Sequence, residues 1–284
     1  MNDGVVNIIV PCYNSEKYLN PFLDSLKKQD YDKIRFIFVN DGSTDNTLDI
    51  LREWVVSAAD NPHRSFNIEV QNHLTQSAAV NTGLLSVDGE YLMLADSDDI
   101  LPPDSVSSKV AALESNKELG YVLSDYEFLY DDGTHIAHKP FCFDKDREIR
   151  FKNFFTQQIP CLSGTYMVRT DMFFEIYKSR QIPFSFLGQN LQFILPMASC
   201  YGGLFLDKTG LLYRQHSDSD YHRAAGFGKA MERNEQLKTL LNDIIPFCSG
   251  DSANLRKLAD ELYVQNKVKI MKEMADKARK HINE

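Results

Sequence analysis

Cysteine is scarce in this chain, and the scarcity excludes two kinds of protein. The 284 residues contain five cysteines, and no two of them form a C-x-x-C pair. The spacing therefore gives no sign of a structural zinc site or a redox-active dithiol, and the odd count argues against a disulfide framework. We expect such a chain in a reducing, cytoplasmic setting.

Long apolar runs and an excess of positive charge are also missing. No apolar run approaches the ~18 residues that cross a membrane, and we expect no signal peptide, because no basic region precedes an apolar stretch at the N-terminus. The net charge of −9 argues against a general nucleic-acid-binding protein, since phosphate backbones require a basic surface. The length allows one large domain or two small ones.

Strand and helix patterns alternate over the first hundred residues. Short, mostly apolar segments predict strands at 5–10, 34–39, 68–70 and 91–95, with helices between them. This alternation is typical of an α/β fold with a mostly parallel, twisted sheet flanked by helices. Ligands of such sheets bind beyond the carboxyl ends of the strands. Polar clusters stand there: PCYN, NDGSTD and DSDD.

After residue 120 the pattern changes. Residues 121–130 and the following Asp131-Asp132-Gly133 predict a strand that enters a hairpin turn. Further strands are predicted at 165–169 and 211–214, and helices from Asp171 and over 189–200. From about Gly226 the chain is amphipathic and helical to its end. Its basic last stretch, KVKIMKEMADKARKHINE, is expected to pack on the domain or on a homodimer partner; the alternative is peripheral contact with an anionic membrane.

The most acidic segment is YLMLADSDDILPPD, residues 91–104. An Asp-x-Asp string alone is weak evidence, because the chain repeats it at 30/32, 144/146 and 218/220. Asp96-Ser97-Asp98 differs because it follows an apolar strand, which would hold the carboxylates rigidly. Hard oxygen ligands suit Mg²⁺ or Mn²⁺, which could bridge them to a diphosphate. The alternative is that these are helix-capping and solvated loop residues.

NDGSTDNT, residues 40–47, also has two interpretations. Asp41-Gly42 predicts a turn, and Ser43, Thr44 or Asp45 can cap the next helix, as Ser15 can cap the first. Alternatively, Asp41 accepts a hydrogen bond from a base or a ribose. Tyr13 either stacks on that base or belongs to the core.

Four segments in order, IIVPCYNSEKYL, FIFVNDGSTDNT, QSAAVNTGL and GEYLMLADSDDIL, together resemble the family 2 glycosyltransferases, which are inverting, nucleotide-sugar-dependent enzymes of the GT-A fold. The resemblance is close over the first hundred residues and looser to about Ser219. It implies a GT-A domain over residues 1–220 and a helical C-terminal extension over 221–284. It also implies transfer of a hexosyl-type sugar to a hydroxyl of a glycan or lipid-linked acceptor, as in bacterial cell-surface polysaccharide synthesis, at the inner membrane face.

The resemblance gives roles to the matched residues. The donor, expected to be a UDP-sugar, would be bound by Pro11, Tyr13, Asn14, Asp41, Ser77, Asn81, Asp96 and Ser97. Within this set, Asp41 would contact the base and Asp96 the ribose. Asp98 would hold Mn²⁺ or Mg²⁺ on the diphosphate. His216, in LLYRQHSDS, would close over the diphosphate beside the metal, unless it is a surface loop histidine.

Two positions depart from the family pattern. Gln189-Asn190 stands where relatives commonly carry the catalytic base motif Glu-Asp, and an amide does not usefully take a proton at neutral pH. Either another group is the base, with Asp125, Asp207 and His216 as candidates, or the chain is a catalytically weak or inactive nucleotide-sugar-binding protein. Val80 replaces an arginine, which removes a cation. A third possibility is that Asp96 and Asp98 bind a metal for structure only.

Overall fold

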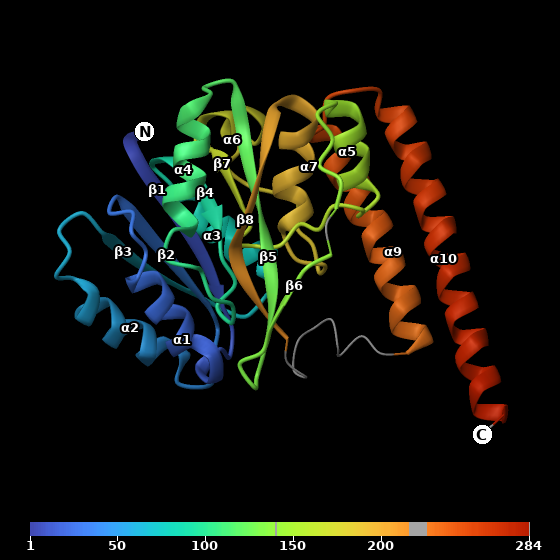
Figure 1. The fold of residues 1–284 in the computed structure, drawn as a ribbon, viewed down its shortest axis with the longest axis horizontal. Coiled ribbons are helices and arrows are strands. Elements are labelled where there is room, and N and C mark those ends of the chain that lie inside the picture. The colour runs from blue at the N-terminus through green and yellow to red at the C-terminus, as the bar shows by residue number, and fades with distance from the viewer. Residues whose placement is uncertain (140, 216–225, 284) are drawn as a thin grey trace.

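The computed structural model describes residues 1–139, 141–215 and 226–283, with side chains to residue 276. Figure 1 shows a central sheet with helices on both of its faces and a pair of long helices at one end. The sheet order is β3-β2-β1-β4-β7-β5-β6, and β8 also pairs with β5. This is the mixed, mostly parallel α/β architecture that the sequence predicts.

The first half of the sheet is parallel. Its strands are β1 (Asn2–Cys12), β2 (Ile34–Asp41), β3 (Ser65–Gln71) and β4 (Gly89–Leu94). β1, β2 and β3 extend their predicted strands, whereas β4 begins earlier than the predicted 91–95 and ends one residue before it. β1 and β2 are apolar runs buried on both faces, as parallel strands usually are. The connecting helices are α1 (Glu16–Lys27), α2 (Thr47–Ala58) and α3 (Gln76–Leu84).

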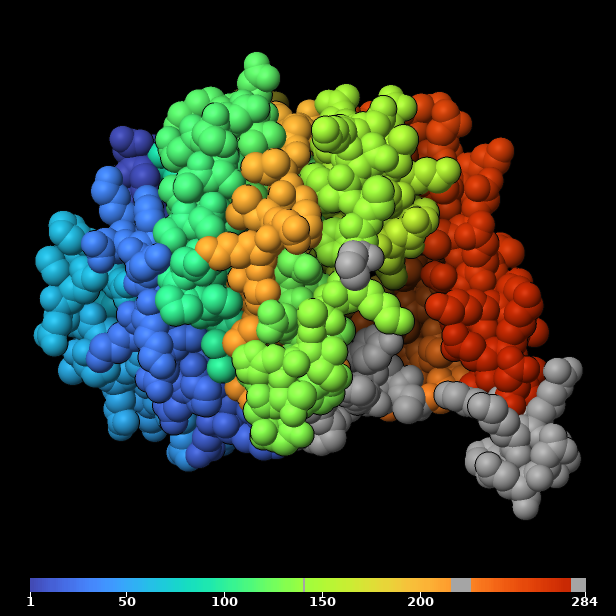
Figure 2. All heavy atoms as spheres, in the orientation of Figure 1, coloured from blue at the N-terminus to red at the C-terminus, as the bar shows by residue number. Residues whose placement is uncertain are grey.

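The second half of the sheet contains antiparallel pairs. β7 (Tyr166–Arg169) runs antiparallel to both β4 and β5 (Leu119–Tyr130), and β5 forms the predicted hairpin with β6 (His135–Ala137). β8 (Gly202–Gln215) begins at Gly202 rather than at the predicted residue 211. Its glycine-rich start packs on Tyr121, since a Cβ at Gly203 would lie 2.1 Å from the Tyr121 ring. In Figure 2 the hairpin and β8 lie together at the front surface.

Two apolar clusters fill the space between the sheet and its helices. One face is covered by α1, α2 and α4 (Ser105–Ser115), and the other by α3, α5 (Arg147–Phe155), α6 (Thr170–Ile176) and α7 (Asn190–Cys200). The helices near Asp171 and over 189–200 were predicted, whereas α4 and α5 were not. The serine-rich first turns of α4 hid an apolar stripe of Val106, Val110 and Leu113.

The C-terminal part is helical, as predicted. It consists of α9 (Phe227–Ile244), the short 3₁₀ helix η1 (Ile245–Phe247) and α10 (Ser252–Asn283), with α10 outermost in Figure 1. Leu237, Leu240 and Leu241 of α9 join the same apolar cluster as α7. Among the described residues, no helix is long and apolar enough to cross a membrane. The predicted domain boundary at residue 220 stays a prediction.

Of the predicted helix caps, Asp45 bonds the first N–H of α2, whereas the predicted cap chemistry of Ser15 is wrong. Ser15 occupies the N-cap position of α1, but its hydroxyl makes no cap hydrogen bond and instead lies 2.7 Å from the Ser97 hydroxyl. Asn46, rather than residues 43–45, precedes α2. Asp45 accepts hydrogen bonds from the backbone N–H groups of Thr47 (3.0 Å) and Glu16 (3.1 Å). Asp45 therefore bonds the first residue of both α1 and α2, while Ser15 joins its loop to the loop that contains Ser97.

Lys109 of α4 is fully buried. Its Nζ donates to the hydroxyl of Ser105 at 2.7 Å and to the Ser105 carbonyl at 3.1 Å. Burial, the largest cause, lowers the pKa of the ammonium group to about 7. The folded protein therefore binds fewer protons than the unfolded chain at pH values between about 7 and the ordinary lysine pKa of about 10.4.

This difference predicts that the native protein becomes more stable as the pH rises through that window. Relative to Lys109→Met, the wild-type free energy of unfolding should increase by up to about 1.4 kcal/mol per pH unit between pH 7.5 and 9.5. Urea unfolding of both proteins at several pH values measures it. Parallel pH dependences in the two proteins would contradict the buried, neutralised lysine.

Candidate active site at the carboxyl edge of the sheet

Four loops meet at the carboxyl edge of the parallel strands: residues 12–15, 42–46, 72–75 and 95–99. Neighbouring parallel strands end at the same edge, so the predicted clustering of PCYN, NDGSTD and DSDD is confirmed. Side chains join the loops directly. Asn14 accepts a hydrogen bond from the Thr44 N–H at 2.8 Å, and Ser15 contacts Ser97. The loop after β3, which the sequence analysis passed over, belongs to the same group.

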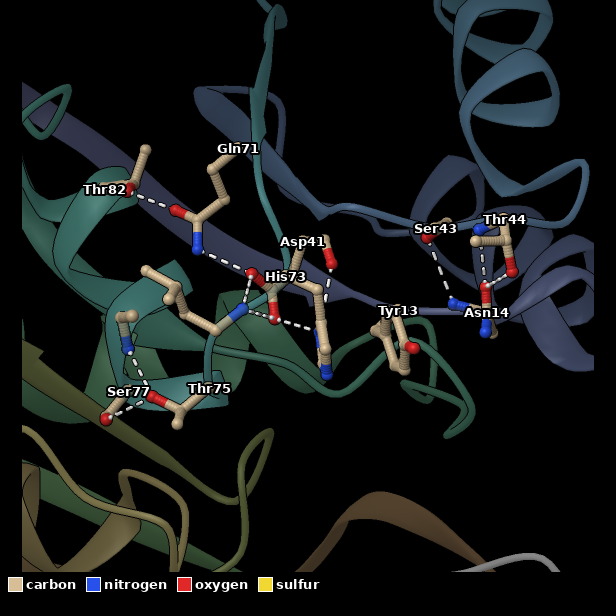
Figure 3. A network of polar contacts seen from close by, with 12 residues as sticks. Tyr13, Asn14, Asp41, Ser43, Thr44, Gln71, His73, Thr75, Ser77 and Thr82 are labelled. Carbon is tan, nitrogen blue, oxygen red and sulfur yellow. Dashed lines mark hydrogen bonds and ion pairs between the residues drawn. The ribbon is translucent and has the colours of Figure 1, made fainter.

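Asp41 is the most heavily hydrogen-bonded carboxylate at this edge (Figure 3). It is buried and accepts hydrogen bonds from Gln71 Nε2 (2.6 Å), His73 Nδ1 (2.9 Å) and the Leu74 N–H (3.1 Å). The approach of residue 73 depends on Gly42, whose φ is +69° and whose Cβ would lie 2.5 Å from the His73 nitrogen. The carboxylate predicted to contact the base is thus held in a fixed position.

Tyr13 lies beside Asp41 and is 45% exposed, so the interpretation of Tyr13 as a core residue is wrong. Its ring stacks on His73, with centroids 3.7 Å apart and planes 12° from parallel. Asn14 adopts a positive φ of 48°, and Pro11 is buried in β1. Nothing in the sequence analysis singled out His73, although it follows directly on the polar end of a predicted strand.

The loop after β4 concentrates negative charge. Asp99 is 1% exposed, and burial followed by the charges of Asp98 and Asp96 raises its pKa well above the ordinary value. Asp96 is half-buried; burial and then Asp98 raise its pKa to about 7, against hydrogen bonds that include one of 2.8 Å from Gln76 Nε2. Asp99 is therefore not a solvated loop residue, and the loop as a whole favours a neighbouring cation.

The end of β8 holds this acidic loop in place. Ile100 and Leu212 exchange two backbone hydrogen bonds of 3.1 and 2.9 Å. Arg214 donates its backbone N–H to Asp99 Oδ1 and its Nε to the Asp98 carbonyl, both at 2.8 Å. Its guanidinium also lies 5.2 Å from the centre of the Tyr18 ring. The sequence analysis gave Arg214 no role. His216, which was predicted to lie at the metal, is outside the described residues.

The base-motif position lies next to Asp96. Gln189 is buried, donates to the Ser163 hydroxyl at 2.9 Å and lowers the pKa of Asp96 through a hydrogen bond. Asn190 Oδ1 accepts hydrogen bonds from Ser163 Oγ (2.9 Å) and from the Tyr166 hydroxyl (2.6 Å). Both amides therefore belong to one network with Asp96. Ser163 could not be foreseen, because it precedes an antiparallel strand.

Two further residues that were predicted to bind the sugar donor, Ser77 and Asn81, hold the loop at residues 182–185. Ser77 is fully buried and exchanges hydrogen bonds of 2.8 and 2.9 Å with the backbone of Ser185, and Asn81 pairs in the same way with Ile182. They join α3 to the segment that leads to Gln189, and their contact with a donor stays a prediction. Val80 is fully buried in the core, so the missing arginine belongs to a position that does not face the site in this structure.

The remaining base candidates lie in the antiparallel half. Asp125 follows Ser124, whose N–H bonds the Thr165 carbonyl, so it is near the level at which β4 ends. Asp207 is exposed in an irregular stretch of β8, between the residues that pair with Ser124 and Asp125. Neither position is excluded as the base.

The carboxylates of the β4 loop provide the chemistry for a divalent cation. Asp96 and Asp98 are half-buried, mutually repulsive oxygen donors, which is the donor type that Mg²⁺ and Mn²⁺ prefer. Within the part of the chain that the structure describes, no three His, Cys, Asp or Glu side chains form a metal-binding group. Two carboxylates leave room for a cation to take further ligands from a bound molecule.

Comparison with known proteins agrees with this architecture. The family model for "Glycosyl transferase family 2" matches residues 7–177. Two Streptococcus pneumoniae proteins named glycosyltransferase GlyA and GlyG are 36% identical over 139 residues and 31% identical over 146 residues. These matches cover 48% and 50% of this chain but only 19% and 46% of the relatives.

Solved structures share the fold at lower identity. S. aureus TarS 1–349, crystallised with UDP-GlcNAc, gives a TM-score of 0.68 at 20% identity and covers 91% of this chain and 71% of its own. The mannosyltransferase PcManGT from Pyrobaculum calidifontis, solved with GDP-Man and Mn²⁺, gives 0.58 at 16% identity and covers 98% and 80%. The fold is thus that of the GT-A proteins. The family model matches more than half of the chain, and this chain therefore belongs to glycosyl transferase family 2.

The contacts of Arg214 predict a measurable loss of stability on its removal. Arg214→Met should lower the free energy of unfolding by about 2 kcal/mol, because a charged donor leaves the Asp98 carbonyl and a buried acidic loop loses its nearest cation. Urea unfolding at pH 7 measures it. Arg52→Met is the matched control, since Arg52 and its partner Asp49 are mostly exposed, and should change stability by less than about 0.5 kcal/mol. Equal effects of the two substitutions would contradict the role of Arg214 in holding the acidic loop.

Proposed function

We propose that this chain transfers a sugar, with inversion, from a UDP-sugar to a hydroxyl of a glycan or lipid-linked acceptor. The observation that carries the proposal is the arrangement of one sheet edge. Tyr13, an aromatic ring, follows β1, and Asp41, a buried carboxylate, ends the neighbouring strand β2. The half-buried Asp96 and Asp98 follow β4, on the other side of β1. A nucleoside diphosphate needs both kinds of group: the first pair for its base and the second for a cation on its phosphates.

The residues divide the work as follows. Asp41 would accept a hydrogen bond from the base, Tyr13 would stack on it, and Asp96 would bind the ribose. Asp98, with His216 from the adjoining segment, would hold Mn²⁺ or Mg²⁺, which when bound acts as a Lewis acid on the diphosphate. The acceptor oxygen bonds to the anomeric carbon as the bond from that carbon to the phosphate oxygen breaks. The acceptor proton passes to a general base, for which Asp125, Asp207 and His216 are the candidates.

The metal role predicts a specific loss of binding. UDP should bind more tightly with Mn²⁺ than without it, and Asp98→Ala should abolish this dependence and weaken binding at least about tenfold. Titration calorimetry with UDP and GDP, with and without Mn²⁺, measures both effects. Asp30→Ala, in a second Asp-x-Asp string, is the matched control and should bind like the wild type. If neither nucleotide binds the wild-type protein under any condition, the donor site is not there.

A second candidate function is favoured by the amides at the base-motif position. Gln189 and Asn190 lie in the network around Asp96 but have no basic oxygen to offer. A protein of this kind would bind a nucleotide-sugar without efficient transfer. Metal held at Asp96 and Asp98 for structure only would instead bind with an affinity that is indifferent to UDP.

Asn190→Asp separates the two functions. A carboxylate at residue 190 can still accept from Ser163 and Tyr166, so the substitution keeps these two hydrogen bonds. If another group is already the base, we expect turnover of a panel of UDP-sugars to change less than about threefold. A gain of 10²-fold or more, the usual contribution of a general base, would show that the wild type is a binding protein with a lost base. The rate of UDP release is the measurement.

Acceptor, assembly and location rest on the family and on α10. Val264, Val268 and Met271 are exposed on this helix, in a stretch that carries several lysines. Such a surface suits a homodimer partner or the anionic inner face of a membrane. We place the protein in the cytoplasm, peripheral to that membrane, where a lipid-linked acceptor would be reached.

A further inference from the structure

The His73 side chain occupies the place that a nucleobase would take. It lies between the two groups proposed to recognise the base, stacked on Tyr13 at 3.7 Å and bonded through Nδ1 to Asp41 at 2.9 Å (Figure 3). A flat, nitrogen-bearing ring that stacks on a tyrosine and donates an N–H to a carboxylate makes the two contacts expected of a uracil or guanine. The imidazole thus reproduces the interactions of the ligand.

Both partners of His73 are committed to it. Asp41 Oδ1 already accepts from Gln71 and from the Leu74 N–H, and His73 is the side-chain donor to Oδ2. Each carboxylate oxygen has two lone pairs, so little accepting capacity remains for a base. The side chain of Asp41 is only 5% exposed, and a base that approaches it past Tyr13 meets the imidazole first. Base and imidazole therefore compete for the same space and the same oxygen.

The position of His73 permits it to leave. Its side chain is 49% exposed, and Tyr13 is exposed to a similar degree. The backbone of residue 73 is fixed separately, by close packing on Gly42 and by the bond from the next N–H to Asp41. A rotation about the side-chain torsions would carry the ring into solvent without moving the loop. Its departure would leave Asp41 Oδ2 without its side-chain donor, which the N–H of an incoming base would replace.

We propose that His73 closes the base subsite in the free protein and must swing out before the donor binds, so that it sets the affinity for the nucleotide. The inference rests on the proposed function, because it takes Tyr13 and Asp41 as the base subsite. A ligand that binds only the minor, open state has its apparent affinity reduced by the fraction of that state. Removal of the imidazole removes this reduction.

The test is the affinity of His73→Ala for UDP, measured by calorimetry with Mg²⁺. We expect binding of the order of tenfold tighter than in the wild type. His63→Ala, at another exposed histidine, is the matched control and should bind like the wild type. Unchanged or weaker binding by His73→Ala, in a protein with a wild-type circular dichroism spectrum, would overturn the inference, and weaker binding would mean that His73 contacts the base rather than excluding it.

A second measurement uses the unmodified side chain. In the free wild-type protein, nuclear Overhauser effects should connect the ring protons of Tyr13 and His73, and saturation with UDP and Mg²⁺ should abolish them. Their persistence at saturation would overturn the inference while leaving the donor site intact. If neither the wild type nor His73→Ala binds UDP or GDP at all, the proposed function fails, and the inference fails with it.

Discussion

Repulsion among the carboxylates that follow β4 is the constraint on which the rest of the site depends. Asp96, Asp98 and Asp99 fall within four residues, and Asp99 is almost fully buried. Burial first, and then the charges of the neighbouring carboxylates, raise the pKa values of Asp96 and Asp99. Left alone, such a loop would turn outward into water. It stays at the sheet edge because Arg214 and the bridge between Ile100 and Leu212 bind it from β8.

These contacts between β8 and the acidic loop also explain the unusual length of β8. A short strand over 211–214 would be enough to complete the sheet, but the strand starts at Gly202 and runs beside β5 along its whole length. Its far end delivers Arg214 to the acidic loop and leads into the segment that contains His216. The second half of the sheet therefore supports the charged edge of the first half.

The sequence predicted the parallel half well because two simple signals coincide there. Buried apolar runs define β1, β2 and β4, and polar clusters mark the edge where ligands bind. Position placed Asp41, Asp96 and Tyr13 at that edge, whereas their expected roles came from the resemblance to the family. Side-chain hydrogen bonds between loops could not be predicted. Ser15 resembles a helix cap in the sequence, and only the fold brings it to Ser97. Ser163 reaches the site from the turn before the antiparallel strand β7, to which the edge rule does not apply. Arg214 lies near the end of β8, which runs parallel to β5 but whose full length the sequence did not predict.

His73 marks a different limit of sequence reasoning. Its place after the third strand follows the same rule as the other loops, but the predicted strand is short, and its end is hard to fix from Ile68 and Val70 alone. What makes His73 informative is its pair of contacts, with a ring and with a carboxylate that lie on two other loops. Such a contact depends on the register of β1, β2 and β3, which a single sequence does not contain.

The amides of residues 189 and 190 fit the same electrostatic argument. Two carboxylates at these positions would add charge beside Asp96, in a network where burial and Asp98 already raise the pKa of that group. The amides keep the hydrogen bonds, because Gln189 donates to Ser163 and Asn190 accepts from Ser163 and Tyr166, and they add no repulsion. The chain thereby lowers the electrostatic cost of its acidic edge. An amide also takes up no proton at neutral pH, so the stability of the site and its basicity are opposed at this position.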